Sequence, residues 1–241
     1  WVGALTLYKK EFLRFLIVLV NTIFSPFISS LLFLLVLSLA IGTERGEVLG
    51  VPFIIFLAPG LIAMQVIQQS FSHSSSSFMI GKIQGNIVDL LYAPLSATEV
   101  TISVCLAAVT RSFMIAAISI IVFYLMIDIQ IKHFFTLILF TFLSSFILGN
   151  IGTIAGLWAE KFDHMASVTN FVIVPLSFLS GTFYTIDRLP GFLKTVSEGN
   201  PFFYMIDGFR YSFIGVADGS IKVGIIYLTI LSFLSWLATY I

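Results

Sequence analysis

Charged residues are scarce in this sequence. Asp, Glu, Lys and Arg together make up 10% of it, whereas hydrophobic residues make up 59%. Soluble domains carry roughly 25% charged residues, so this composition is typical of a polytopic membrane protein. The 12 basic and 12 acidic side chains balance each other, which excludes the basic surface that nucleic-acid binding needs. We therefore expect membrane lipids, and no nucleic acid, among its partners.

Cysteine occurs once, at Cys105. A single cysteine cannot form a disulfide within the chain, and its apolar surroundings predict an inert thiol in the protein core. The chain begins with Trp1 rather than methionine. We therefore expect it to have been trimmed, and no cleavable signal sequence can be read from it.

The motifs of common catalytic sites are also missing. There is no GxxxxGK[ST] loop to hold the phosphates of ATP, no HExxH, CxxC or paired histidines for a metal, and no GxSxG nucleophile. The expected spans contain no carboxylate or histidine of the kind that ion-coupled carriers place in mid-membrane. We expect no enzyme activity and no metal or cofactor bound by this chain itself.

Long apolar runs are what the sequence does have, and they predict six membrane-spanning helices in a single transmembrane domain, 1–241. We place the spans at about residues 17–41, 53–71, 98–127, 134–158, 168–183 and 221–241. An even number of spans puts both termini on one side of the membrane. Lys and Arg in short loops usually set the orientation, but here they are divided about evenly between the two sides.

The segment before the first span has the pattern of a helix that lies in the membrane interface. One of its faces would carry Leu5, Tyr8, Phe12, Phe15 and Leu16, and the opposite face Lys10, Glu11 and Arg14. The alternative is that this segment simply begins the first span.

Several residues within the spans predict contacts between helices. Pro26 predicts a kink in the first span. Gln65, Gln68 and Gln69 are costly toward lipid, so we expect them to join helices, with substrate binding as the alternative. Gly152-x-x-x-Gly156 allows close approach of two backbones and predicts packing only.

Arg111 is a charge inside the third expected span. A guanidinium there costs at least about 2.5 kcal/mol, so it needs a partner. The candidates are Glu160, Asp163 and a lipid phosphate. We expect structural pairing rather than contact with a substrate.

A short amphipathic helix is predicted between the second and third spans, after a flexible polar run at Ser74–Ser77. Its apolar face would carry Ile83, Ile87, Leu90 and Leu91, and its polar face Lys82, Gln84, Asn86 and Asp89. Pro94 stops this helix, and Ser96 with Glu99 forms a capping box for the next one. On periodicity alone the helix could be a membrane-surface anchor.

The stretch from Pro175 to Gly215 begins as a span and then turns polar. Breaks at Pro190 and at Asn200-Pro201 predict two short helices at one membrane face, with Gly215 ending the second. An ordinary loop carrying a lipid-surface helix is the alternative.

Two segments resemble the type-2 ABC exporter permeases. The C-terminal resemblance rests on Pro175, Ser180-Gly181, Leu189-Pro190, Asn200-Pro201, Asp207, Arg210 and Gly215. The second rests on Asp89, Leu90-Leu91, Pro94-Leu95-Ser96 and Glu99. Gly81-Lys82 stands where that family commonly has an arginine.

The resemblance implies an all-α integral membrane protein with six transmembrane helices, an N-terminal interfacial helix, a cytoplasmic coupling helix and an external helical hairpin before the last span. It implies contact with an ATPase through Lys82, Ile83, Ile87, Asp89, Leu90, Leu91 and Pro94. It implies an external gate hairpin containing Pro190, Asn200, Pro201, Asp207, Arg210 and Gly215.

The same resemblance implies a permease subunit that exports a drug, lipid or glycan across the bacterial cytoplasmic (inner) membrane. Both termini would be cytoplasmic. Its partners would be a second permease copy, in a homodimer, and two ABC ATPase subunits that bind ATP and Mg. The alternatives are an ion-coupled secondary transporter or channel, and a membrane-embedded enzyme or scaffold.

Overall fold

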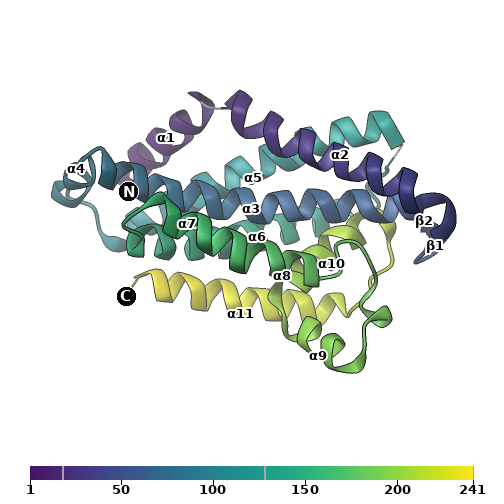
Figure 1. Cartoon of the computed structure of the whole chain (residues 1–241). Coiled ribbons are helices and arrows are strands. Elements are labelled where there is room, and N and C mark those ends of the chain that lie inside the picture. Colours follow the sequence, from purple (N-terminus) through teal and green to yellow (C-terminus); the bar gives the residue numbers. More distant parts are fainter. Residues whose placement is uncertain (18, 128, 241) are drawn as a thin grey trace.

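Long helices form nearly all of this computed structural model, which describes residues 1–17, 19–127 and 129–240, without the side chains of 19–25 and 41–45 (Figure 1). In chain order its elements are α1 (Val2–Ile17), α2 (Leu19–Arg45), β1 (Glu47–Val48), β2 (Val51–Pro52), α3 (Phe53–Ile83), α4 (Ile87–Tyr92), α5 (Ala97–Ile127), α6 (Phe134–Trp158), α7 (Phe162–Val168), the π-helical turn η1 (Thr169–Ile173), α8 (Val174–Leu179), the 3-10 turn η2 (Ile186–Arg188), α9 (Gly191–Gly199), α10 (Pro201–Ile214) and α11 (Ile221–Tyr240).

Five helical runs among the described residues are long and apolar enough to cross a membrane: α3, α5, α6, the run Phe162–Leu179 and α11. The first predicted span falls on α2, and its described apolar part is Pro26–Ala40. An all-α membrane protein is therefore confirmed, while the count of six spans stays a prediction. The fifth span starts earlier than predicted, at Phe162, and contains the π-helical turn.

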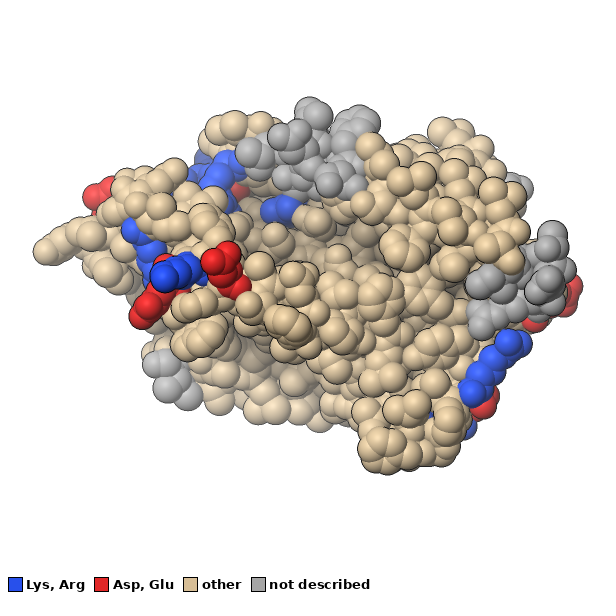
Figure 2. Space-filling view, in the orientation of Figure 1, with Lys and Arg blue, Asp and Glu red and all other residues tan. Residues whose placement is uncertain are grey.

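α3 is the central helix of the bundle, packed against α5, α6, α10 and α2. In its most apolar stretch 72% of the residues are buried, against 17% in α11 and in the run Phe162–Leu179. These two outer runs therefore offer their apolar side chains to lipid or to another chain. On the face shown in Figure 2, charged side chains gather mostly toward the two ends and leave a broad uncharged band between them.

The two ends of the bundle carry different elements. Both termini and α4 lie at one end, and β1, β2 and α9 lie at the other (Figure 1). β1 and β2 form a small antiparallel hairpin in which Val48 pairs with Val51. The short helix before the third span and the broken helices before the last span are thus at opposite ends, as predicted.

The serine run at 74–77 is not a flexible loop. It belongs to α3, and Ser74 and Ser75 are fully buried. The physical reason lies on α6, where a Cβ atom on Gly152 would come within 2.5 Å of the Phe71 carbonyl oxygen and one on Gly156 within 2.6 Å of the Ser75 carbonyl oxygen. Small residues on both helices let the two backbones meet, so the predicted packing role of the glycine pair is confirmed.

Gly152→Ala is expected to destabilise the bundle by about 2 kcal/mol, because the added methyl group meets the α3 backbone, which cannot rotate away. Gly149→Ala on the same helix is the matched control, since its Cβ atom would lie an ordinary 3.4 Å from Ala108. Thermal unfolding of the detergent-solubilised protein measures both variants. Equal melting temperatures for the two would contradict the close α3–α6 contact.

α1 packs against α5, and its buried residues are Ala4, Leu7, Glu11 and Phe15. Of the predicted apolar face, Phe15 is buried with them, whereas Leu5 and Leu16 are exposed. The predicted placement of this helix in the membrane interface stays a prediction. Glu11 lies inside because it meets cations there, as described below.

Candidate functional site

The helix predicted between the second and third spans is divided in the structure between the end of α3 and a separate short helix, α4. α3 ends at Ile83, and the chain turns at Gly85 with a φ of 76° before α4 begins. The prediction of one helix with Ile83, Ile87, Leu90 and Leu91 on a single face is therefore wrong. Gly85 adopts the left-handed conformation that glycine adopts without strain, and such a residue ends a helix.

The predicted boundary after α4 is confirmed. Ala93 and Pro94 lead out of α4, and α5 starts at Ala97. The Glu99 amide donates to Ser96 Oγ at 3.2 Å, and the Ser96 amide donates to Glu99 Oε2 at 3.0 Å. These reciprocal bonds are a capping box, which fixes where α5 begins.

α4 carries an exposed apolar face at its end of the molecule. Leu91 is 77% exposed and Tyr92 86% exposed, and Val88 is also exposed. We call these three residues the exposed face of α4. Ile83, the last residue of α3, is exposed as well. Val88 and Tyr92 were missed by the sequence analysis, although their spacing of four residues places them on one side of a helix.

The other side of α4 is turned toward α1. Ile87 and Leu90 are partly buried and line cavities shared with Leu7 of α1. Asp89 is exposed at the edge of one of these cavities. The predicted apolar face is thus divided, with Ile83 and Leu91 outward and Ile87 and Leu90 inward.

Lys82 is directed at α6. Its Nζ donates to the carbonyl oxygen of Ala159 at 3.0 Å and also to that of Leu157. A lysine at these carbonyls stabilises the C-terminal end of α6. Lys82 therefore lies apart from the exposed face of α4, and its contact with an ATPase stays a prediction.

The breaks predicted in the hairpin coincide with helix ends. Pro190 precedes α9, and Asn200 caps α10 by accepting from the Phe202 amide at 3.1 Å. Pro201 occupies the first turn of α10, and Gly215 ends α10 with a φ of 80°. Proline at the start and glycine at the end is the usual order in helices.

Arg210 fastens the hairpin to the bundle. It is 1% exposed, and its Nη2 donates to the carbonyl oxygens of Gly181 at 2.7 Å and Thr182 at 3.2 Å. Its guanidinium carbon lies 3.9 Å from the centroid of the Phe56 ring on α3. A Cβ atom on Gly60 would lie 2.8 Å from Nη2, so a residue without a side chain leaves room for the arginine.

Asp207 and Asp218 fasten the other side of the hairpin. Asp207 accepts from the amides of Asp218 and Gly219, each at 2.9 Å. Asp218 accepts from the Ile186 amide at 2.6 Å. Burial raises the pKa of Asp218, and the hydrogen bond from Ile186 opposes that rise. The two carboxylates thus join η2, α10 and the start of α11.

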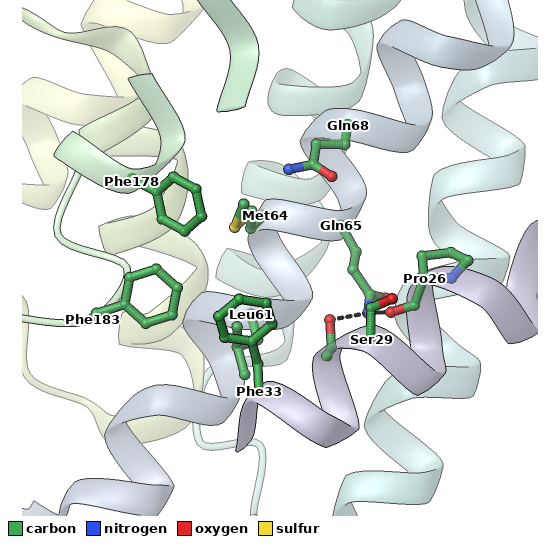
Figure 3. Close-up of a pocket in the computed structure, with 10 residues that line it drawn as sticks. Pro26, Ser29, Phe33, Leu61, Met64, Gln65, Gln68, Phe178 and Phe183 are labelled. Carbon is green, nitrogen blue, oxygen red and sulfur yellow. Dashed lines mark hydrogen bonds between the residues drawn. The ribbon is translucent and has the colours of Figure 1, made fainter. Parts of the chain in front are cut away.

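A groove of about 170 Å³ lies between α2, α3 and the end of α8 (Figure 3). Gln65 contacts α2, where its Nε2 donates to the Pro26 carbonyl at 2.8 Å and also to Ser30, and its Oε1 accepts from Ser119 of α5 at 3.2 Å. The predicted role of Gln65 in joining helices is confirmed.

Gln68 lies in this groove with aromatic side chains nearby. Phe33, Phe178 and Phe183 are among the lining residues, and Figure 3 shows Gln68 above Met64 on the same helix. An amide among aromatic rings offers hydrogen bonds and apolar contact in one place.

Arg111 is paired, but not with the predicted carboxylates. Its partners on α3 are Gln69 and His73, and neither Glu160 nor Asp163 forms an ion pair with it among the described residues. The helix that carries the second predicted span extends beyond that span, through His73, which is buried.

The fold defines a multi-pass, all-α membrane protein. The ABC-2 type transporter family matches residues 3–214. The chain is 32% identical over 218 residues to the inner membrane transport permease YadH of Escherichia coli K12, covering 90% of this chain and 85% of that protein. It is 22% identical over 228 residues to Nodulation protein J of Rhizobium leguminosarum bv. viciae, covering 92% and 87% respectively. This chain belongs to the ABC-2 type transporter family.

Proposed function

We propose that this chain is the permease through which an ABC exporter moves a hydrophobic or amphipathic drug, lipid or glycan outward across the bacterial cytoplasmic membrane. A separate ATPase supplies the energy and binds ATP and Mg. The observation that carries this proposal is the exposed face of α4, with Leu91 and Tyr92 at the opposite end of the bundle from the hairpin. Large exposed apolar patches mark protein contacts.

Both termini and α4 are placed on the cytoplasmic side in this proposal, and the α9–α10 hairpin is placed outside. α4 lies directly between the long helices α3 and α5 in the chain. A force on α4 therefore reaches both helices through short connections. ATP binding and hydrolysis favour inward or outward states through different contacts with α4.

Two identical permease copies and two ATPase subunits complete the proposed transporter. α2 and the run Phe162–Leu179 are the proposed dimer contacts, because both carry exposed apolar side chains such as Phe33 and Phe171. The groove containing Gln68 lies beside these helices and is the proposed cargo path. η2, α9 and α10 form the proposed outer gate.

Copurification tests this proposal. The tagged permease is expected to retain an ABC ATPase, identified by mass spectrometry. Proteoliposomes of the complex are expected to move a fluorescent phospholipid or a hydrophobic cationic dye only when ATP is hydrolysed. Uphill movement by the permease alone, driven by an ion gradient, would instead establish the ion-coupled carrier.

A further inference from the structure

Arg111 belongs to a buried polar cluster where α1, α3 and α5 meet. It is 7% exposed, its Nη2 donates to Gln69 Oε1, and its Nη1 lies 3.3 Å from His73 Nδ1. Its guanidinium carbon is 5.4 Å from the centroid of the Phe15 ring. The α1 helix contributes Glu11 and Arg14 to the same cluster through their contacts with His73.

The charges of this cluster do not cancel. Arg14 pairs with Glu11, with Nη2 and Oε2 2.9 Å apart. Within the described part of the chain no carboxylate lies within ion-pair distance of Arg111, and its other contacts are an amide, an imidazole and an aromatic ring. A buried charge without a counter-ion is costly, so this cluster lacks one negative charge.

Polar atoms of the cluster also lack partners. Arg111 Nε and His73 Nε2 are buried without a hydrogen bond. Beside them is a cavity of about 230 Å³, lined by Arg14, His73 and Arg111 together with the hydroxyl-bearing Ser72 and Ser76. Ser72 is exposed and Arg14 half-buried, so the cavity opens to the surface between α1 and α3. Arginines and hydroxyls around one cavity are donors suited to a phosphate group.

The depth of this cavity places it near one leaflet's headgroups. At about 1.5 Å per residue, the helical distance from Phe53 to His73 is about 30 Å, which is roughly the thickness of the hydrocarbon core. On α5 the distance from Arg111 to Ile127 is about 24 Å by the same rise. The cavity therefore lies near the membrane boundary on the α4 side, where lipid phosphates are found.

We propose that this cavity binds the phosphate group of an anionic phospholipid from the leaflet on the α4 side. The phosphate contacts Arg14 and Arg111 and supplies the missing negative charge. A lipid held there joins α1 to the α3–α5 pair. The site is separate from the groove containing Gln68, which has no lining residue in common with it.

Native mass spectrometry of the detergent-solubilised full chain tests the site, with phosphatidylglycerol as the probe. The wild-type protein is expected to retain phosphatidylglycerol. Arg14→Gln is expected to weaken retention about tenfold, the effect of losing one charge-assisted hydrogen bond. Lys9→Gln removes the same charge from the exposed surface of α1 and is the matched control, with no change expected.

Thermal unfolding with inorganic phosphate distinguishes a lipid from a soluble ligand. Protection by phosphatidylglycerol that depends on Arg14 assigns the site to a lipid. Protection by inorganic phosphate alone, lost in Arg14→Gln and kept in Lys9→Gln, assigns it to a soluble phosphate. If the two variants respond equally to both probes, the site does not exist. None of these readouts depends on the ATPase or on transport.

Discussion

Leu91→Asp is expected to abolish ATP-driven transport while leaving membrane insertion and folding intact. Leu91 is 77% exposed and makes few contacts that the substitution could break. If α4 docks into an apolar cleft of the ATPase, the new carboxylate loses its water there without gaining a partner. Burying an unpaired polar group costs about 3 kcal/mol or more, which corresponds to at least about a hundredfold weaker association.

The measurement is binding of the purified ATPase to the permease in detergent, together with transport in proteoliposomes. Phe192→Asp is the matched control, since Phe192 on α9 is also a large exposed apolar residue but lies at the opposite end. It should leave ATPase binding unchanged. Asp89→Ala at the edge of α4 is expected to uncouple ATP hydrolysis from export. Transport that survives both Leu91→Asp and Asp89→Ala contradicts the role proposed for α4.

The long helices could be predicted from the sequence because several of their ends are determined by residues close to them in the chain. The apolar run ending at Trp158, the capping box at Ser96 and the glycine at 215 each act within a few residues. The hairpin was predicted for the same reason, since proline at 190 and at 201 limits where a helix can begin.

The errors concern residues whose environment is set by distant segments. In the sequence Ser74 looks like part of a polar loop. In the fold, Gly152 and Gly156 of α6 pack against α3 and bury it. Glu11 looks like a surface residue of α1 until Arg14 and His73 are found beside it. Periodicity describes one helix at a time and cannot show which polar residues on neighbouring helices meet.

The segment around α4 shows a second limit of prediction from the sequence. Some of its apolar residues were identified, but Val88 and Tyr92 were missed, and the pattern was read as one continuous helix through Gly85. A positive φ there turns the chain and separates Ile83 from Ile87. The family resemblance implied that this segment contacts an ATPase, which stays a prediction, whereas the role of Lys82 at the end of α6 required the tertiary structure.

Arg210→Met is expected to give the largest loss of stability, about 3 kcal/mol. The substitution keeps a long apolar side chain but leaves the carbonyl oxygens of Gly181 and Thr182 without their charged donor, and it removes the contact with the face of Phe56. Hydrogen bonds to charged groups contribute about 1.5–3 kcal/mol, and the cation–π contact adds about 1 kcal/mol. For a chain of this size the melting temperature should fall by about 10 °C.

Arg188→Met is the matched control, because Arg188 lies in the same hairpin and is exposed. Its melting temperature should stay within about 1 °C of the wild type, since exposed substitutions have small effects. Arg210→Lys keeps the charge but not the forked geometry of the guanidinium. Its melting temperature should therefore lie between those of Arg210→Met and Arg188→Met. If Arg210→Met and Arg188→Met have the same melting temperature, the hairpin is held by its apolar contacts alone. If only Arg210→Met is unstable, one buried cation joins α10 to the end of α8, and a gate formed by this hairpin must move as a unit with Gly181 and Thr182.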